Sequence, residues 1–161
     1  MNHKLEITVC KTSFDFNVAK KITKDYMEWL GFDLCFQNID LEFETFDTMY
    51  NQPEGCFIYA TYQGNVVGGV GIRKLADGIC EMKRLYVYPN YQGSKIGLQL
   101  CETILTIAKK LRYQKMRLDT IAKLDKAIRL YQFLGFYEIE KYCENPDETA
   151  QFMEIMLSYK N

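Results

Sequence analysis

Histidine is almost absent from this sequence, which has only His3, and its six cysteines are scattered without a C-x-x-C pair. Zinc sites are built from closely spaced cysteine and histidine ligands, so the pattern predicts no metal site. Disulfide frameworks belong to oxidising compartments and to small cysteine-dense domains, and this composition is typical of neither. We therefore expect free thiols, largely buried, and a reducing cytoplasmic setting.

Two further kinds of partner find no support in the composition. The 161 residues carry a net charge of −1, so nothing marks the chain as a nucleic-acid binder. No apolar run is long enough to cross a bilayer, and the N-terminal segment MNHKLEITVC lacks the apolar core of a signal peptide. The sequence thus predicts neither nucleic acid nor membrane as a partner. Its length suits one domain over residues 1–161 with a full core.

Periodicity and turn residues predict strands and helices in alternation. The expected helices cover residues 14–30, 41–50, about 98–111 and 125–134. The expected strands cover residues 5–9, 57–62, 66–74, 79–88, 116–121, 136–142 and 152–159. Hairpin turns make the early strands antiparallel, and a strand–helix–strand unit makes the fourth and fifth parallel. We expect an α/β (α+β) fold with a mixed, mostly antiparallel sheet of about seven strands flanked by four helices.

The segment from Glu81 to Gly97 joins a β-prone stretch to a helix through a loop that contains glycine. The first N–H groups of a helix have no partner inside the helix, and the helix dipole is positive at that end. Glycine lets a ligand approach the backbone closely. The segment therefore predicts a site for a phosphate or pyrophosphate. A plain strand-to-helix turn is the simpler alternative, because a loop with two glycines is a weak signal by itself.

Three motifs in this part of the chain resemble the GNAT superfamily, the acetyl-CoA-dependent N-acetyltransferases. Gln92-x-x-Lys95-x-Gly97 is similar to the signature Q/R-x-x-G-x-G/A, with Lys95 in place of the middle glycine. The other two are similar to the family's fifth strand and the helix after it: Leu118-Asp119-Thr120 and Ala127-x-x-Leu130-Tyr131-x-x-x-Gly135-Phe136. The resemblance covers roughly residues 56–136. It implies a GNAT fold and direct transfer of an acetyl group from acetyl-CoA to a primary amine in a ternary complex.

The resemblance also implies which residues hold acetyl-CoA as cosubstrate. In the family, exposed backbone of the fourth strand pairs with the pantetheine arm, and that role falls here on Leu85, Tyr86 and Val87. The pyrophosphate falls on the loop and the first helical turn: Gln92, Gly93, Ser94, Lys95, Ile96, Gly97 and Leu98. Many members have asparagine where this chain has Leu124, so no coenzyme contact is carried over to that side chain. Dimers are common in the family, so a homodimer is compatible with the resemblance.

Glu81 and Tyr131 are the two candidate catalytic side chains. Glu81 precedes Gln92 by eleven residues, the offset at which lysine acetyltransferases of the superfamily carry their general base. A solvent-exposed glutamate on a strand is the simpler alternative. Tyr131 falls on an apolar helix stripe, which is typical of a core aromatic residue. A tyrosine at this place is the family's usual general acid, facing the coenzyme sulfur.

Residues 31–72 contain six acids and no lysine or arginine. Such a stretch predicts either a solvated acidic face or the rim of a cleft for a cationic amine, such as a polyamine, an aminoglycoside-like compound or a lysine side chain. Two other functions stay open. One is an acyl-CoA sensor of the same fold that does no catalysis. The other is an acyltransferase for a longer acyl chain, which a wider tunnel beside Gly68, Gly69 and Gly71 would favour.

Overall fold

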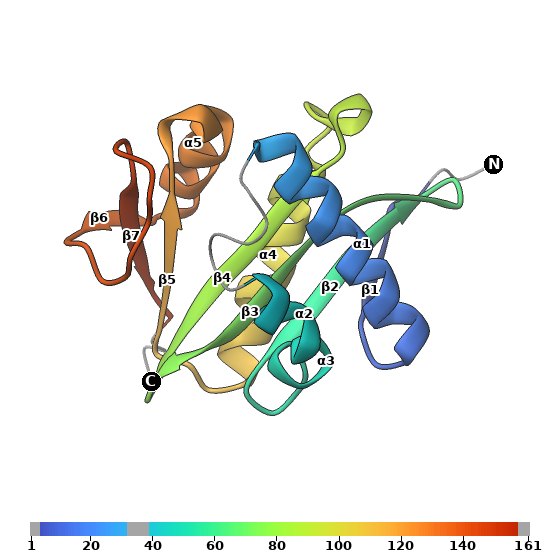
Figure 1. The fold of residues 1–161 in the computed structure, drawn as a ribbon, viewed down its shortest axis with the longest axis horizontal. Helices are drawn as coiled ribbons and strands as arrows, with labels where there is room; N and C mark the ends of the chain where they lie inside the picture. The colour runs from blue at the N-terminus through green and yellow to red at the C-terminus, as the bar shows by residue number, and fades with distance from the viewer. Residues whose placement is uncertain (1–3, 32–38, 158–161) are drawn as a thin grey trace.

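A seven-stranded sheet forms the centre of the computed structural model, which describes residues 4–31 and 39–157 (Figure 1). The strand order is β1-β2-β3-β4-β5-β7-β6, and every neighbouring pair is antiparallel except β4 and β5. The strands are β1 (Glu6–Val9), β2 (Cys56–Tyr62), β3 (Asn65–Ala76), β4 (Ile79–Val87), β5 (Lys115–Thr120), β6 (Tyr137–Ile139) and β7 (Gln151–Met156). The expected α/β class and the mixed, mostly antiparallel sheet are confirmed.

Helices cover both faces of this sheet, with α1, α2 and α3 on one face and α4 on the other (Figure 1). Their bounds are α1 (Ser13–Leu30), α2 (Ile39–Glu44), α3 (Phe46–Met49), α4 (Ile96–Lys110) and α5 (Asp125–Leu134), with 3₁₀ turns at Pro89–Tyr91 and Ala122–Leu124. A separate hydrophobic cluster lies under each set of helices, because successive strand residues point to opposite faces. Within the described residues, no helix has the length and apolar character needed to cross a bilayer.

Local signals in the sequence define both ends of α1. The Thr12 hydroxyl accepts a hydrogen bond from the Asp15 N–H, and the Asp15 carboxylate accepts one from the Thr12 N–H, each at 3.1 Å. This capping box satisfies two N–H groups that the helix cannot. Gly31 ends the helix in the left-handed region at φ 88°, where glycine has no steric cost. The helix predicted over residues 14–30 is confirmed to within one residue.

The structure differs from the sequence prediction in three places. The helix expected over residues 41–50 is two short helices, because Thr45 leaves helical geometry at φ −106° and ψ 8°. This break makes five α-helices rather than four in the described chain. The strand expected over residues 136–142 is only three residues long, since β6 is an edge strand paired with β7 alone. The last strand ends at Met156, and residues 158–159 of its predicted range lie outside the described residues.

The cysteines of the described chain are free thiols, as the composition predicts. Four of them are buried and one is partly exposed: Cys10, Cys56, Cys80, Cys101 and Cys143. Cys35 lies outside the described residues.

β4 and β5 pair over three residues and then separate. Their parallel register joins Ile79 to Lys115, Cys80 to Met116 and Glu81 to Arg117, whereas β4 continues to Val87. Figure 1 shows the two strands opening away from each other toward α5. From residue 82 onward, the backbone of β4 therefore has no strand partner on this side within the described chain. Backbone N–H and C=O groups need partners, so this edge can bind an extended ligand.

A β-bulge deforms β4 where it leaves β5. The register with β3 shifts between Gly69, which pairs with Tyr86, and Gly71, which pairs with Lys83. Two residues of β4 therefore face one residue of β3. Arg84, inside this bulge, has the left-handed φ of 63°, which is a strained conformation for a residue with a side chain.

The glycines of β3 allow the neighbouring strands and rings to pack against this bulge. A Cβ on Gly68 would lie 2.5 Å from the carbonyl oxygen of Tyr86, and one on Gly71 would lie 2.7 Å from a ring carbon of Phe57. Glycines inside a strand often mark a bulge or the close approach of another group, and both features are present here. Backbone and aromatic rings lie directly beside these glycines, so the described structure does not favour a wider tunnel for a longer acyl chain there.

A buried ion pair holds the bulge against α2. Glu42 accepts hydrogen bonds from Arg84 Nε at 3.1 Å and from the second guanidinium nitrogen at 2.9 Å. The two side chains are only 8% and 7% exposed. Burial alone would raise the pKa of Glu42, but the Arg84 guanidinium outweighs it and the pKa is lowered. This pair joins the acidic helix α2 to the strand that borders the opening.

We expect Glu42→Gln to lower the free energy of unfolding at neutral pH by about 3 kcal/mol, because it leaves Arg84 buried without a counter-charge. The pKa of Glu42 is lowered on folding, so its contribution is present above the unfolded-state pKa and is lost as pH falls through the folded-state pKa. The stability difference from the parent should therefore shrink in acid. Urea unfolding across the acidic range measures it.

Asp47→Asn is the matched control, because Asp47 pairs with Lys20 at 2.8 Å at the surface. Its loss should stay below about 1 kcal/mol. Equal losses for the two variants would contradict a special role for the buried pair.

Candidate functional site

A cleft of about 660 Å³ opens between the free edge of β4 and helix α5. Nine of the ten residues that the sequence assigns to acetyl-CoA line it: Leu85, Tyr86, Val87, Gln92, Gly93, Lys95, Ile96, Gly97 and Leu98. Ser94 does not line the cleft, and its hydroxyl donates a hydrogen bond to the Tyr91 carbonyl at 2.5 Å. The structure thus brings the strand edge, the glycine loop and the start of α4 together on one side of a single groove.

The loop before α4 leaves the helix N-terminus open. Lys95 takes the N-cap position in the left-handed conformation, φ 64°, and its side chain forms no capping hydrogen bond. A Cβ on Gly97 would point between Leu130 and Val87, at 3.5 and 3.8 Å from their side chains, so glycine widens the groove there. Gln92 braces the loop by donating from its amide nitrogen to the Val87 carbonyl at 2.9 Å. The free N–H groups of the first turn of α4 can therefore meet an anion.

The opposite wall of the cleft comes from residues that the sequence analysis did not assign. Apolar side chains of α5, Leu130 and Phe133, lie in this wall, and Phe133 is 78% exposed. Cations border the same cleft: Lys123, Lys126 and Arg129. An exposed apolar residue beside cations suits a ligand with an apolar arm and phosphate groups. The amphipathic pattern of residues 125–134 is the sequence signal that could have identified this wall.

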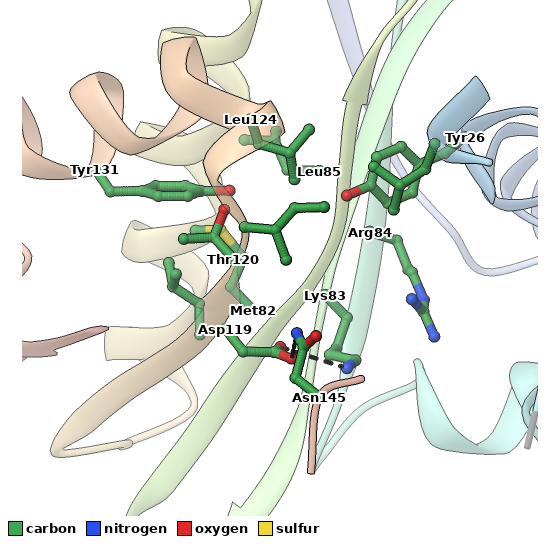
Figure 2. A pocket seen from close by; sticks show the side chains of 13 residues that line it. Tyr26, Met82, Lys83, Arg84, Leu85, Asp119, Thr120, Leu124, Tyr131 and Asn145 are labelled. Atoms are coloured by element: carbon green, nitrogen blue, oxygen red, sulfur yellow. Dashed lines mark hydrogen bonds and ion pairs between the residues drawn. The ribbon is translucent and has the colours of Figure 1, made fainter. Parts of the chain in front are cut away.

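A second, smaller cavity of about 60 Å³ lies beyond β4, where β4 and β5 part (Figure 2). Its walls combine polar and apolar side chains: Tyr26, Leu30, Met82, Lys83, Arg84, Leu85, Leu118, Asp119, Thr120, Ile121, Leu124, Tyr131 and Asn145. Tyr26, Leu85 and Leu124 line the cleft as well. The cleft and the cavity therefore adjoin at these three residues.

Tyr131 lies in the wall of this cavity, and its hydroxyl points inward beside the hydroxyl of Thr120 (Figure 2). The side chain is 6% exposed, and its ring packs against Phe136 at a centroid distance of 5.6 Å. Burial raises the pKa of Tyr131 well above its ordinary value, so the hydroxyl keeps its proton. Thr120 Oγ1 is buried without a hydrogen-bond partner in the described structure. A protonated hydroxyl aimed into a polar cavity can donate a proton or a hydrogen bond to a ligand there.

Glu81 lies on β4 just before the strands separate, but it lines neither the cleft nor the cavity. Its side chain is 1% exposed, and both carboxylate oxygens accept hydrogen bonds. One oxygen accepts from Arg73, directly across the β3–β4 pair, at 3.0 Å, and the other accepts from the Tyr142 hydroxyl at 2.7 Å. The surface glutamate that was the simpler alternative is therefore excluded, while the role of general base stays a prediction.

Glu81, Asp119 and Cys143 bring three potential metal-ligand atoms within 4.8 Å of one another. Their surroundings do not suit a cation. The Lys83 ammonium lies 3.8 Å from Glu81 and 4.0 Å from Asp119, and it already supplies positive charge. Burial raises the pKa of the Cys143 thiol to about 11, so the thiol stays protonated at neutral pH and is a poor metal ligand.

The acids of residues 31–72 do not gather around the cavity in the described part of the chain. None of them is among its lining residues. Glu42 pairs with Arg84, Asp47 with Lys20, and Glu54 with Lys74. Asp33 lies outside the described residues. The charged groups that do border the cavity come from β4 and β5.

Comparison with known proteins agrees with the motifs and the fold. The model of the acetyltransferase (GNAT) family matches residues 21–136. An uncharacterised N-acetyltransferase of Schizosaccharomyces pombe (strain 972) is 35% identical over 96% of both chains. Among solved structures, a GNAT-family acetyltransferase from Staphylococcus aureus Mu50 superposes with a TM-score of 0.79 at 21% identity, covering 96% of this chain and 100% of its own.

A putative acetyltransferase from Salmonella typhimurium, YncA, was solved with its cofactor acetyl-CoA. It matches with a TM-score of 0.75 at 17% identity, over 99% of this chain and 96% of its own. These structural likenesses establish a shared fold. The family model and the S. pombe relative cover the glycine loop, β4 and the helix that carries Tyr131. On this basis, the chain belongs to the acetyltransferase (GNAT) family and is an acyltransferase.

Proposed function

We propose that this protein moves an acetyl group from acetyl-CoA to a primary amine by direct transfer in a ternary complex. The observation that carries the proposal is the contact between cleft and cavity at Tyr26, Leu85 and Leu124. A long cosubstrate in the cleft and an amine in the cavity would reach the edge of β4 from opposite sides. Holding both reactants in place converts a bimolecular step into an effectively unimolecular one. The amine is cationic in neutral water, so it must lose a proton before it reacts.

Residues of the cleft fit acetyl-CoA in three respects. The backbone of Leu85–Val87 has no strand partner on the cleft side. Apart from the Val87 carbonyl, which accepts from Gln92, it can pair with the amide groups of the pantetheine arm. The uncapped N-terminus of α4 can receive the pyrophosphate, and Gly97 leaves the space for it. Bound there, acetyl-CoA would supply an acetyl group activated as a thioester. The bulge at Arg84 turns the β4 backbone at the border of cleft and cavity, where an N–H group could bind the carbonyl oxygen as it gains charge.

Two side chains would then move protons. The Tyr131 hydroxyl, which keeps its proton, would give it to the departing thiolate as the general acid. Glu81 would take the amine proton as the general base, and since it does not line the cavity, the proton would travel through a group that does. Both oxygens of Glu81 accept hydrogen bonds, and Glu81 lines neither the cleft nor the cavity. For this reason, a non-catalytic acyl-CoA sensor is kept as the alternative function.

Acetyl-CoA should raise the melting temperature, because a ligand that binds only the folded state stabilises it by mass action, by about 2.7 kcal/mol at a hundred times its dissociation constant. Gly97→Val should remove this shift, because its side chain would occupy the groove between Val87 and Leu130. The melting temperature of the variant without ligand should stay near that of the parent. No shift of the parent protein at millimolar acetyl-CoA would refute the proposal.

Tyr131→Phe should lower kcat by roughly ten- to ten-thousandfold while acetyl-CoA binding is kept, because only the proton donor is lost. Single-turnover kinetics with a released-thiol readout measures it. Tyr137→Phe is the matched control: it also removes one hydroxyl, but from an exposed residue of β6 outside the cavity. If Tyr131→Phe were as active as this control, Tyr131 would be only a core aromatic residue.

If Glu81 accepts the amine proton, Glu81→Gln should shift or abolish the acidic limb of the pH profile of kcat. Acetyl-CoA binding should persist, since Glu81 does not line the cleft. The variant also removes a counter-charge from half-buried Arg73, so rates must be normalised to the folded fraction. Matching pH profiles for parent and variant would assign the proton to another group.

A further inference from the structure

Lys83 is a lysine on the wall of the small cavity whose hydrogen-bonding capacity is largely unused. It lies on β4 next to the bulge, and its side chain is only 14% exposed. The Lys83 ammonium lies 3.8 Å from the Glu81 carboxylate and 4.0 Å from the Asp119 carboxylate. Both distances exceed the 2.7–3.2 Å of an N–H···O hydrogen bond. An ammonium group carries three donors and no acceptor, so Lys83 has donors available for a ligand.

Both carboxylates near Lys83 also accept hydrogen bonds from other side chains. Glu81 accepts from Arg73 and from Tyr142 at 3.0 and 2.7 Å. Asp119 accepts from the Asn145 amide nitrogen at 2.9 Å. The amide oxygen of Asn145 is itself held by the Asp147 N–H at 2.9 Å, which fixes the orientation of that side chain. Each carboxylate near Lys83 is therefore held by at least one shorter contact to another side chain.

The remaining polar groups of the cavity include hydroxyls that can also donate to a ligand. Thr120 Oγ1 is buried without a partner in the described structure, and the Tyr131 hydroxyl points into the same space (Figure 2). Tyr26 faces them from α1 across the cavity, and burial raises the pKa of its hydroxyl to about 12, so it too keeps its proton. Asp119 is the one acid that lines the cavity within the described residues. A ligand rich in acceptors complements such a surface better than a second cation does.

We propose that the acceptor carries a carboxylate beside its primary amine and that Lys83 binds this carboxylate, which makes the acceptor an amino acid. The inference rests on the proposed function and names the substrate class of the same site. The amine would lie toward Leu85, where the cavity adjoins the cleft. Lys83 and Leu85 are two residues apart, no more than about 6.8 Å along a strand. That spacing suits the short distance between the amine and carboxylate of an amino acid.

Matched acceptor pairs test this assignment directly. The standard L-amino acids and their carboxamides offer the same amine with and without the negative charge. The preferred acceptor should be the free amino acid, with a kcat/KM at least about tenfold above that of its amide, as expected for a charge-assisted hydrogen bond. Calorimetric titration of the same pairs into the complex with CoA gives a second readout, which does not depend on turnover.

Lys83→Met should lower kcat/KM for the amino acid by roughly ten- to a hundredfold, mainly through KM, and should change that of the amide by less than about threefold. Lys83→Arg should restore part of the loss, because it returns the charge. Lys74→Met is the matched control, since Lys74 lies on β3 outside the cavity and pairs with Glu54 at 3.4 Å. This control should leave both acceptors unchanged.

Failure of the inference is distinct from failure of the proposed function. If acetyl-CoA binds and amines are acetylated without preference for a carboxylate, the assignment of Lys83 is overturned while the acetyltransferase stands. Equal losses for amino acid and amide in Lys83→Met would overturn it as well, as would the absence of amino-acid binding by calorimetry. If acetyl-CoA does not bind, the proposed function itself fails.

Discussion

The early separation of β4 from β5 is the constraint on which the candidate site depends. Two parallel strands that pair over three residues cannot satisfy the backbone groups of the remaining six residues of β4. The unpaired edge runs directly into the glycine loop and the open N-terminus of α4. One continuous stretch of chain thus offers an unpaired strand edge for an extended part of a ligand and a helix N-terminus for its anionic part. The same separation opens the cavity on the side of β5.

Buried charge keeps this opening in shape. Arg84 holds a left-handed conformation inside a bulge, and its bidentate pair with Glu42 supplies the counter-charge that the buried guanidinium needs. Glu81, three residues earlier, is fixed by Arg73 and Tyr142. Lys83 lies between Glu81 and Arg84 in the sequence, and its ammonium is 3.8 Å from the Glu81 carboxylate and 4.0 Å from the Asp119 carboxylate. Strand β4 therefore contributes Glu81 and Arg84, which are each held in a short ion pair, and Lys83, which has N–H donors available for a ligand.

Much of the fold could be predicted from the sequence, because its signals are local. Apolar periodicity and turn residues predicted α1 and most strands to within a few residues, and the structure adds the capping box at Thr12 and the left-handed glycine at position 31. The helix expected over residues 41–50 was wrong as one element, since a break at a single residue such as Thr45 leaves no clear mark on periodicity. The Gln92–Gly97 motif predicted the open loop, and the structure adds that Lys95 meets the backbone requirement at φ 64°.

By itself, the sequence determined the order of elements. It also predicted the strand–loop–helix anion site and, through the family resemblance, the candidates Glu81 and Tyr131. The partners of these residues were decided by the tertiary structure alone, because they lie far along the chain. The hydrogen bond from Tyr142 to Glu81 spans 61 residues, and that from Arg84 to Glu42 spans 42. Helical or strand periodicity extends over a few residues and carries no information about such contacts. Which acids are neutralised, and which cation still faces a cavity, follows only from how the strands and helices pack together.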